Sequence, residues 1–379
     1  MGAWVYCTDI VMTMRDGATN IPRHPVPVRA PSRKSCAVMP ATAGPLPSAC
    51  VPAPTAPSLV RVMMLGIAAG GLFSLTFILN RLMSMEGGHW AWSAALRYLD
   101  TAILLTAWLL VRRGPAFVSR VFALYRARPI VWLLAGGSGY GVTYSCFCYA
   151  AAHTPAWMLS TTWQLTILAS PIVMLAFGAR VPLRGVVALA VIAAGVMIVN
   201  ATRVQDGASM GQVVAGILPV IVAAFTYPLG NQMLSHARHD RNLPGGDILA
   251  DPAVSVLLLT LGALPVFAAV VLGSAPPPPT AGQILDTALV ALVAGCGGMT
   301  LFIYARNMSS DPMRIAAVDA TQASEMFFAL AGDTLFLGAP LPGAMAWTGI
   351  AAVLCGLIAF TVQGQAKQVL DTDATYPEP

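Results

Sequence analysis

From residue 60 onward the chain alternates between long apolar runs and short polar links. Ten runs are each about long enough to cross the roughly 30 Å of hydrocarbon in a bilayer. They cover about 61–80, 90–111, 130–152, 156–177, 183–200, 211–233, 252–272, 283–305, 314–336 and 342–363. Runs of this length predict membrane-spanning helices, because the strands of a membrane barrel have only about ten residues.

The composition also indicates an integral membrane protein. Of 379 residues, 57% are hydrophobic and 10% are charged, whereas a soluble domain has about 25% charged residues. The net charge of +5 comes from basic residues scattered between apolar runs, so nucleic-acid binding is not expected. The seven cysteines show no metal-ligand spacing. We therefore expect neither a metal nor a cofactor.

The two ends of the chain differ from its middle. Residues 1–58 hold ten of the 29 prolines and no long apolar run, which predicts a disordered, basic tail. The alternatives are a start of translation near residues 60–64 and a basic targeting peptide. Residues 366–379 are predicted to form a second disordered tail. Between the tails we expect two five-helix units, 59–205 and 206–365.

The basic residues predict how the helices are oriented, because cytoplasmic loops are enriched in Arg and Lys. With the N-terminus inside, 18 of the 21 Arg and Lys residues lie in cytoplasmic links or tails. The opposite side holds only Arg81 and Arg203, and Arg97 lies within a span. Both termini are therefore expected inside.

A weak internal repeat supports the division into two units. A shift of 158 residues aligns Gly137 with Gly295, Gly139 with Gly297, Gln164 with Gln322, Pro182 with Pro340 and Leu183 with Leu341. Chance matches in apolar sequence are the alternative. Because each unit has an odd number of helices, the second copy must be inserted upside down. Such a 5+5 inverted repeat is the usual basis of alternating access.

The ninth run, 314–336, carries four polar side chains: Asp319, Gln322, Glu325 and Asp333. A carboxylate at the centre of a membrane helix costs roughly 2.5–3.5 kcal/mol and normally faces a cavity or a partner. Glu325 lies about 16 Å from the start of this run, near the midplane. It can bind and release a proton, or it can simply join two helices by a hydrogen bond. Asp319 and Asp333 are expected nearer the inner and outer ends, on the pathway or as interfacial end residues.

Two further groups of polar residues lie within predicted spans. Arg97 and Asp100 are three residues apart and can pair with each other; alternatively Arg97 pairs with Glu325 and sets its protonation. The amides of Gln164 and Gln322, at matching repeat positions, line one cavity or join helices. Aromatic side chains near them can stack on a flat or cationic substrate or serve only in packing. The candidate substrate-binding residues are Gln164, Gln322, Trp163, Tyr144, Asn80 and Asn231.

The architecture and three stretches resemble the drug/metabolite transporter superfamily, and more narrowly its multidrug resistance efflux transporter branch. The stretches are GLFSLTFILNRLMSMEGGHWAWSAALRY (71–98), FTYPLGNQM (225–233) and VDATQASEMFFALAGDTLFLGAPLP (318–342), and the resemblance covers about 60–365. It implies a multi-pass secondary transporter of the bacterial inner membrane that exports a small molecule. The small four-helix exporters of the superfamily place their essential Glu in the first helix, but the run 61–80 has no carboxylate. Glu325 is therefore a candidate proton site because of its own position near the midplane, and not because it matches that motif.

The leading hypothesis is a proton-coupled exporter of small, cationic or drug-like molecules. Its candidate coupling residues are Glu325, Asp319, Arg97 and Asp100. The expected partners are a small-molecule substrate, protons and the lipid bilayer, with the protein acting as a monomer or a homodimer. The first alternative is a metabolite exporter or facilitator for amino acids, sugars or nucleotides. A membrane-embedded enzyme or a sensor is more remote, because no catalytic motif and no soluble signalling domain is visible.

Overall fold

The computed structural model describes residues 58–178, 185–240, 243–308 and 312–375, without the side chains of 250, 312, 313, 316 and 362–375. The predicted N-terminal tail, apart from Ser58, lies outside these ranges, as does the Pro182 and Leu183 part of the repeat. The described backbone is helical and contains no strand. The all-helical prediction is therefore confirmed for these ranges.

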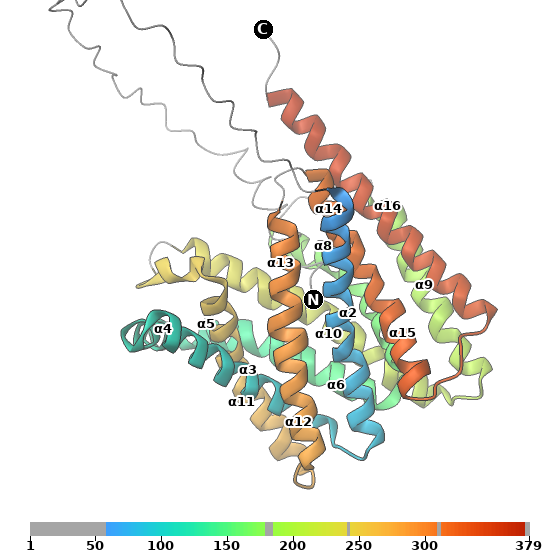
Figure 1. The fold of residues 1–379 in the computed structure, drawn as a ribbon, viewed down its shortest axis with the longest axis horizontal. Coiled ribbons are helices and arrows are strands. Elements are labelled where there is room, and N and C mark those ends of the chain that lie inside the picture. Colours follow the sequence, from blue (N-terminus) through green and yellow to red (C-terminus); the bar gives the residue numbers. More distant parts are fainter. Residues whose placement is uncertain (1–57, 179–184, 241–242, 309–311, 376–379) are drawn as a thin grey trace, which may run out of the picture.

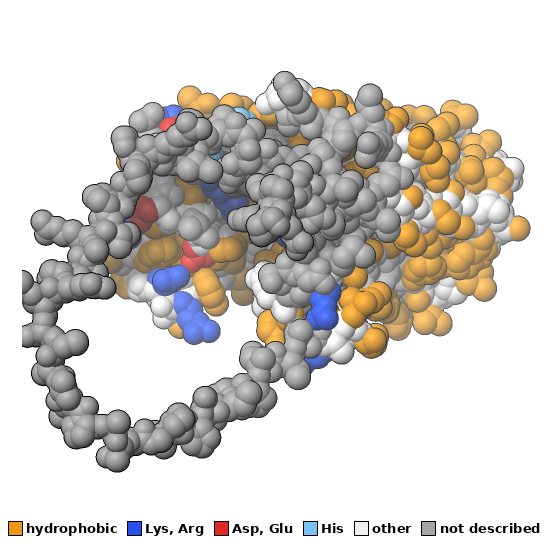
Figure 2. Space-filling view, turned by 90° about the horizontal axis from the view of Figure 1, so that it is seen from above, with side chains coloured by type: hydrophobic (Ala, Val, Ile, Leu, Met, Phe, Trp, Pro, Cys, Tyr) orange, Lys and Arg blue, Asp and Glu red, His pale blue; other side chains and the backbone are white. Residues whose placement is uncertain are grey.

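Eight helices in the described ranges are long and apolar enough to cross a membrane. They are α2 (Leu59–Met85), α3 (Trp90–Arg113), the pair α7 (Ala156–Trp163) and α8 (Leu165–Ala176), α9 (Val186–Gln205), α10 (Met210–His239), α11 (Pro252–Ser274), the rod of α12 (Ala281–Leu289), η4 (Val290–Gly298) and α13 (Met299–Asn307), and α16 (Ala344–Thr375). They coincide with eight of the ten predicted runs. Figure 2 shows hydrophobic side chains over much of the described surface, with charged ones gathered towards the left.

The other two predicted runs consist of shorter pieces. Residues 129–153 form α5 (Pro129–Gly136), η1 (Gly137–Val142) and α6 (Thr143–His153), and residues 312–336 form α14 (Pro312–Ala320), η5 (Thr321–Ala323) and α15 (Ser324–Phe336). Ten spans with both ends inside therefore stay a prediction. α16 continues to Thr375, into the stretch expected to be a disordered tail. Residues 366–375 contain good helix formers and neither Gly nor Pro, which favours this extension.

A short helix, α4 (Pro115–Ala127), occupies part of what the sequence pattern predicts as a link. Val118, Val121 and Leu124 recur every three residues and are buried. Three ion pairs between described residues join the α3–α5 segment to the α10–α11 segment, which includes η3 (Gly246–Ala250). These are Arg113–Asp251 at 3.4 Å, Arg120–Asp247 at 2.8 Å and Arg128–Asp240 at 3.3 Å. Exposed pairs of this kind each contribute at most about 1 kcal/mol.

The helices of the two predicted units pack in corresponding pairs. α2 packs against the α12–α13 rod and against α14–α15, while α10 packs against the α5–α6 rod and against α7–α8. α3 packs on α11, α7 on α15 and α9 on α16. α9 and α16 lie side by side at one edge of the bundle (Figure 1). Their backbones approach closely at Gly195 and Gly349, where an added Cβ would lie within 3 Å of the opposite carbonyl oxygen.

The fourth and ninth predicted runs are interrupted at corresponding positions. α7 ends at Trp163, Gln164 is in a turn, and α8 begins at Leu165. Gln322 is the central residue of the 3₁₀ segment η5, which separates α14 from α15. Similarly, the third and eighth runs both contain a π-helical stretch, η1 and η4. Such irregular stretches inside helices are frequent at functional sites.

Candidate functional site

A pocket lies where α2, α3, α6, α7, α10 and α15 converge. The residues that line it are Phe73, Thr76, Phe77, Tyr98, Thr143, Tyr144, Phe147, Trp163, Tyr227 and Glu325. We call this set the aromatic pocket. The space between the side chains is about 30 Å³, which is the volume of about one water molecule. The pocket is therefore nearly closed in this conformation.

Helical spacing brings these side chains to one place. On α2, Phe73, Thr76 and Phe77 follow an i, i+3, i+4 pattern and so share one face. On α6, Thr143 and Phe147 are one turn apart, and both are buried. α2 and α6 therefore each present aromatic and threonine side chains to the pocket from one face.

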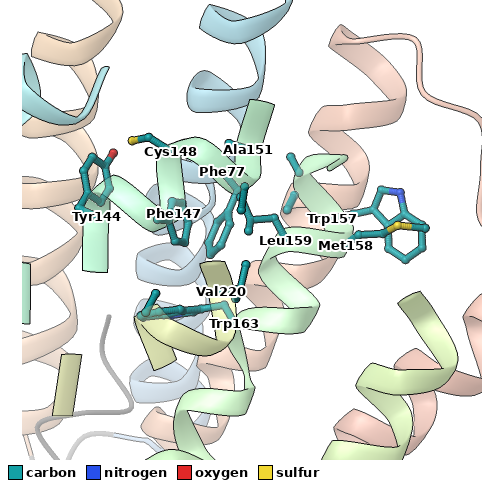
Figure 3. Close-up of a cluster of buried hydrophobic side chains, with 14 of the residues drawn as sticks. Phe77, Tyr144, Phe147, Cys148, Ala151, Trp157, Met158, Leu159, Trp163 and Val220 are labelled. Carbon is teal, nitrogen blue, oxygen red and sulfur yellow. The ribbon is translucent and has the colours of Figure 1, made fainter. Parts of the chain in front are cut away.

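The aromatic rings form a continuous chain of contacts around Phe147 (Figure 3). Its ring centroid lies 5.7 Å from Tyr144, 5.0 Å from Phe77 and 5.7 Å from Trp163. The ring of Trp163 in turn lies 5.8 Å from that of Tyr227. Ring pairs at these separations attract one another, and the faces of such rings also attract cations.

Glu325 is the one carboxylate of the aromatic pocket. It lies in the first turn of α15, directly after the η5 interruption, and only 2% of it is exposed. Its Oε1 has no hydrogen-bond partner in the described part of the protein, and neither does Gln322 Nε2 or Ser324 Oγ. A buried carboxylate oxygen without a hydrogen-bond partner is energetically costly. Binding of a proton or of a cation removes that cost.

Arg97 supports the wall of the aromatic pocket from behind. Its guanidinium lies 4.2 Å from the ring centroid of Tyr144 and 5.3 Å from that of Tyr98, and it hydrogen bonds with both tyrosines. Asp100, the first partner predicted for Arg97, lies beside Thr287 of α12. Arg97 itself does not line the pocket.

Asn80 holds Tyr144 from the other side. Its Nδ2 donates to Tyr144 Oη at 2.8 Å and to the Thr76 carbonyl at 2.6 Å, while Cys148 Sγ donates to its Oδ1 at 3.3 Å. The amide of Asn80 is therefore fully engaged and orients a pocket residue rather than lining the pocket. This is a positioning role that the sequence pattern alone does not distinguish from substrate binding.

The structure brings three of the ten predicted site residues into the pocket lining: Glu325, Trp163 and Tyr144. The others lie outside the lining. Gln164 donates to the Ser160 carbonyl at 3.3 Å, and Asn231 donates to the Tyr227 carbonyl at 3.0 Å. The remaining lining residues were not among the predicted candidates. Except for Thr76 and Thr143 they are aromatic, and aromatic spacing is a signal that lipid-facing residues share.

Two predicted carboxylates of the ninth run have identifiable partners. Asp319 Oδ1 lies 3.8 Å from Arg306 Nε of α13. Asp333 is 1% exposed, and its Oδ2 accepts a hydrogen bond from the Trp157 backbone at 2.9 Å. It also accepts one from the Ala156 backbone. Asp333 thus caps the N-terminus of α7, the helix that carries Trp163.

Tyr144→Phe is expected to lower the free energy of unfolding by about 1–3 kcal/mol, because the hydroxyl bonds both a buried amide and a buried guanidinium. Thermal unfolding in detergent measures the effect. Tyr149→Phe is the matched control, since Tyr149 makes ring contacts with Trp90 and His153 and no hydrogen bond by its hydroxyl is recorded in the described residues. Equal stability of the two variants would contradict the role given to the Tyr144 hydroxyl.

One family model and two relatives match most of this chain. The family model described as "Putative multidrug resistance efflux transporter" (EmrE) matches residues 60–366. "Uncharacterized protein YjlA" of Bacillus subtilis (strain 168) is 30% identical over 326 residues, 82% of this chain and 97% of that protein. "Uncharacterized 42.1 kDa protein in intracellular alkaline protease 3'region" of Shouchella clausii is 32% identical over 282 residues, 71% of each chain.

One solved structure, described as "Crystal structure of protein", has a similar fold. The TM-score is 0.50 at 16% sequence identity, and the match covers 81% of this chain and 99% of that one. At this identity the likeness concerns the fold alone.

Proposed function

Because this chain belongs to the multidrug resistance efflux transporter family, we propose that it is a proton-coupled exporter of small, cationic or drug-like molecules in the bacterial inner membrane. The family and the eight apolar helices make it a multi-pass membrane transporter. The observation that carries the finer proposal is Glu325. It is a buried carboxylate whose Oε1 has no partner, set among aromatic rings.

The chemistry of the aromatic pocket suits exchange of a proton for a cation. A protonated Glu325 is neutral and tolerates its buried position. An organic cation can replace the proton, because the carboxylate neutralises its charge and the ring faces of Tyr144, Phe147 and Trp163 attract it. Since both ligands neutralise the same carboxylate, binding of one disfavours the other. That competition is the minimal requirement for coupled antiport.

Alternating access is the proposed transport cycle. It is supported by the matching interruptions at Gln164 and Gln322, by the π-helical stretches η1 and η4, and by the corresponding packing of α2 and α10. These features favour an inverted 5+5 repeat of ten spans with both ends inside. In such a protein two equivalent units rock around a central site. We propose the two interruptions as the points where the helices bend.

The other predicted residues take supporting roles in this proposal. Asp319, which lies beside Arg306 one and a half turns before Glu325, serves as the inner step of the proton path. Arg97 and Asn80 hold Tyr144 in place, as their contacts with its ring and hydroxyl indicate. The pocket is assembled from one chain, so a monomer is sufficient for the proposed transport.

A metabolite exporter or facilitator is the second candidate. The observation that favours it is Arg97, a buried guanidinium over the rings of Tyr98 and Tyr144. A substrate with an anionic group would gain from this charge at short range. Arg97 does not line the pocket, however, whereas Glu325 does. The geometry therefore favours the cationic substrate.

Purified protein in liposomes that contain a pH-sensitive dye tests the proposal. Aromatic ammonium compounds, amino acids, sugars and nucleotides are added one at a time, with protein-free liposomes as the control. We expect aromatic ammonium compounds to drive proton movement. Saturable movement of another solute without protons would instead support the facilitator.

A further inference from the structure

A second and larger hollow lies between the ends of α5, α8 and α10. Its volume is about 260 Å³, and its lining consists of Arg128, Val131, Phe177, Met233, His236, Ala237, Asp240 and Leu243. We call it the inner cleft, because the positive-inside pattern assigns these helix ends to the cytoplasmic side. It can hold a small organic group, whereas the aromatic pocket in the same conformation cannot.

The inner cleft combines an apolar floor with rings and a charged rim. The floor is made of Val131, Met233, Ala237 and Leu243. The rings of Phe177 and His236 lie 5.3 Å apart at one side. At the rim, Arg128 Nη1 lies 3.3 Å from Asp240 Oδ2, and their side chains are 45% and 32% exposed. Such a partly exposed ion pair contributes at most about 1 kcal/mol to stability.

The inner cleft and the aromatic pocket lie one after the other along the same three helical rods. On α10, Tyr227 lines the pocket and Met233 lines the cleft, about 9 Å apart at 1.5 Å per residue. On the α5–α6 rod, Val131 lines the cleft and Tyr144 lines the pocket. On α7–α8, Trp163 lines the pocket, and Phe177, directly after α8, lines the cleft. Residues of both hollows on all three rods place the two hollows next to each other along the bundle.

A layer of three aromatic rings consists of two residues that line the aromatic pocket, Tyr227 and Trp163, and of Tyr140, which lies between Val131 and Tyr144 in the sequence. The ring of Tyr227 stacks on that of Tyr140 at 6.4 Å with an angle of 17°, and it meets Trp163 at 5.8 Å. Tyr140 belongs to the π-helical stretch η1. Its neighbour Gly139 packs directly on Gly230 of α10, where an added Cβ at Gly139 would lie 3.0 Å from the Gly230 Cα. At this point the two backbones pack without intervening side chains, so η1 and α10 approach each other closely.

We propose that the inner cleft is a cytoplasmic loading site for the transported molecule and that the Tyr140–Tyr227–Trp163 layer is the gate between it and the aromatic pocket. The ligand is an amphiphile with an aromatic body and one cationic group. Its body lies on the apolar floor between Met233 and Phe177, and its charge lies at the rim beside Asp240. This inference rests on the proposed function, because it supplies the inner approach to the same pocket.

Filling the cleft provides the test. Met233→Trp adds a bulky ring to the floor, and transport is measured in liposomes with all protein molecules in one orientation. For substrate offered from the cytoplasmic side we expect KM to rise about tenfold, while KM from the outer side stays unchanged. Val222→Trp on the same helix is the matched control, because Val222 is 38% exposed on the outer surface of the bundle. An unchanged KM, or an equal rise from both sides, would overturn the proposal.

A binding measurement distinguishes a failure of this inference from a failure of the proposed function. A fluorescent aromatic ammonium dye is titrated onto detergent-purified wild type, Met233→Trp and Val222→Trp, after thermal unfolding shows that all are folded. We expect Met233→Trp to weaken dye binding about tenfold relative to Val222→Trp. If wild type transports no substrate but this difference in dye binding is observed, the proposed function fails, while the assignment of the inner cleft as a binding site is retained. If both variants bind the dye like wild type, the cleft assignment fails whatever the transport data show.

Discussion

Glu325→Gln is expected to abolish substrate-driven proton movement without loss of the folded protein. Glutamine has nearly the volume of glutamate but cannot exchange a proton, so the competition between proton and cation disappears. Stability should be equal or higher, because the change replaces a buried carboxyl whose Oε1 is unpaired with an uncharged amide. The measurement is proton movement in dye-loaded liposomes after addition of an aromatic ammonium compound, together with thermal unfolding in detergent.

The matched control for this result is Asp206→Asn. It makes the same carboxyl-to-amide change at the exposed C-terminal end of α9, away from the pocket. Asp206→Asn should keep full proton coupling. If Glu325→Gln also keeps it, Glu325 is not the proton site, and Asp319 becomes the next carboxylate to replace. If Glu325→Gln melts well below wild type, the carboxyl has a structural partner and the exchange mechanism loses its basis.

Of the variants discussed, Asp333→Ala is expected to lose the most stability. Its free energy of unfolding should fall by roughly 3 kcal/mol or more. The carboxylate accepts hydrogen bonds from the Ala156 and Trp157 backbones, and each buried N–H left without an acceptor costs about 1–3 kcal/mol. The change also removes the carboxylate whose charge acts on Arg81. Denaturant or thermal unfolding in detergent checks the prediction.

Two further variants make the Asp333 result interpretable. Asp333→Asn keeps one acceptor oxygen, so its stability should fall between those of wild type and Asp333→Ala. Asp206→Ala removes an exposed carboxylate and should cost no more than about 0.5 kcal/mol. An Asp333→Ala protein as stable as Asp206→Ala would show that the α7 cap is unimportant. Transport should fall together with stability, because α7 positions Trp163.

The positions of the membrane helices follow from the sequence, because the rule behind them is local. A span needs about 20 consecutive apolar residues whatever it packs against, and eight predicted runs coincide with apolar helices of the structure. α4 was missed because its three buried residues, Val118, Val121 and Leu124, recur within a basic segment too short to span a bilayer. Its burial depends on the neighbouring α3 and α5, which also pack on it.

The residues that line the pocket were harder to predict, because the packing of the helices decides which side chains face a pocket. Glu325, Trp163 and Tyr144 stood out as polar or aromatic residues within apolar runs, and they do line the pocket. Phe73, Phe77 and Tyr227 line it equally, but a membrane helix is apolar on all sides, so its periodicity does not separate residues facing lipid from residues facing a pocket. Gln164 and Gln322 were singled out by the repeat, and they lie at the helix interruptions instead.

The sequence by itself determined that this chain is helical, membrane-spanning and related to efflux transporters, since apolar length and family similarity are read along the chain. Only the tertiary structure decided what each buried polar group does. Asp333 caps α7 from 176 residues away, and Asn80 holds Tyr144 from 64 residues away. Glu325 meets aromatic rings from five other helices. In a bilayer the backbone polar groups are satisfied within each helix, whereas the partner of a buried polar side chain is chosen by how the helices pack.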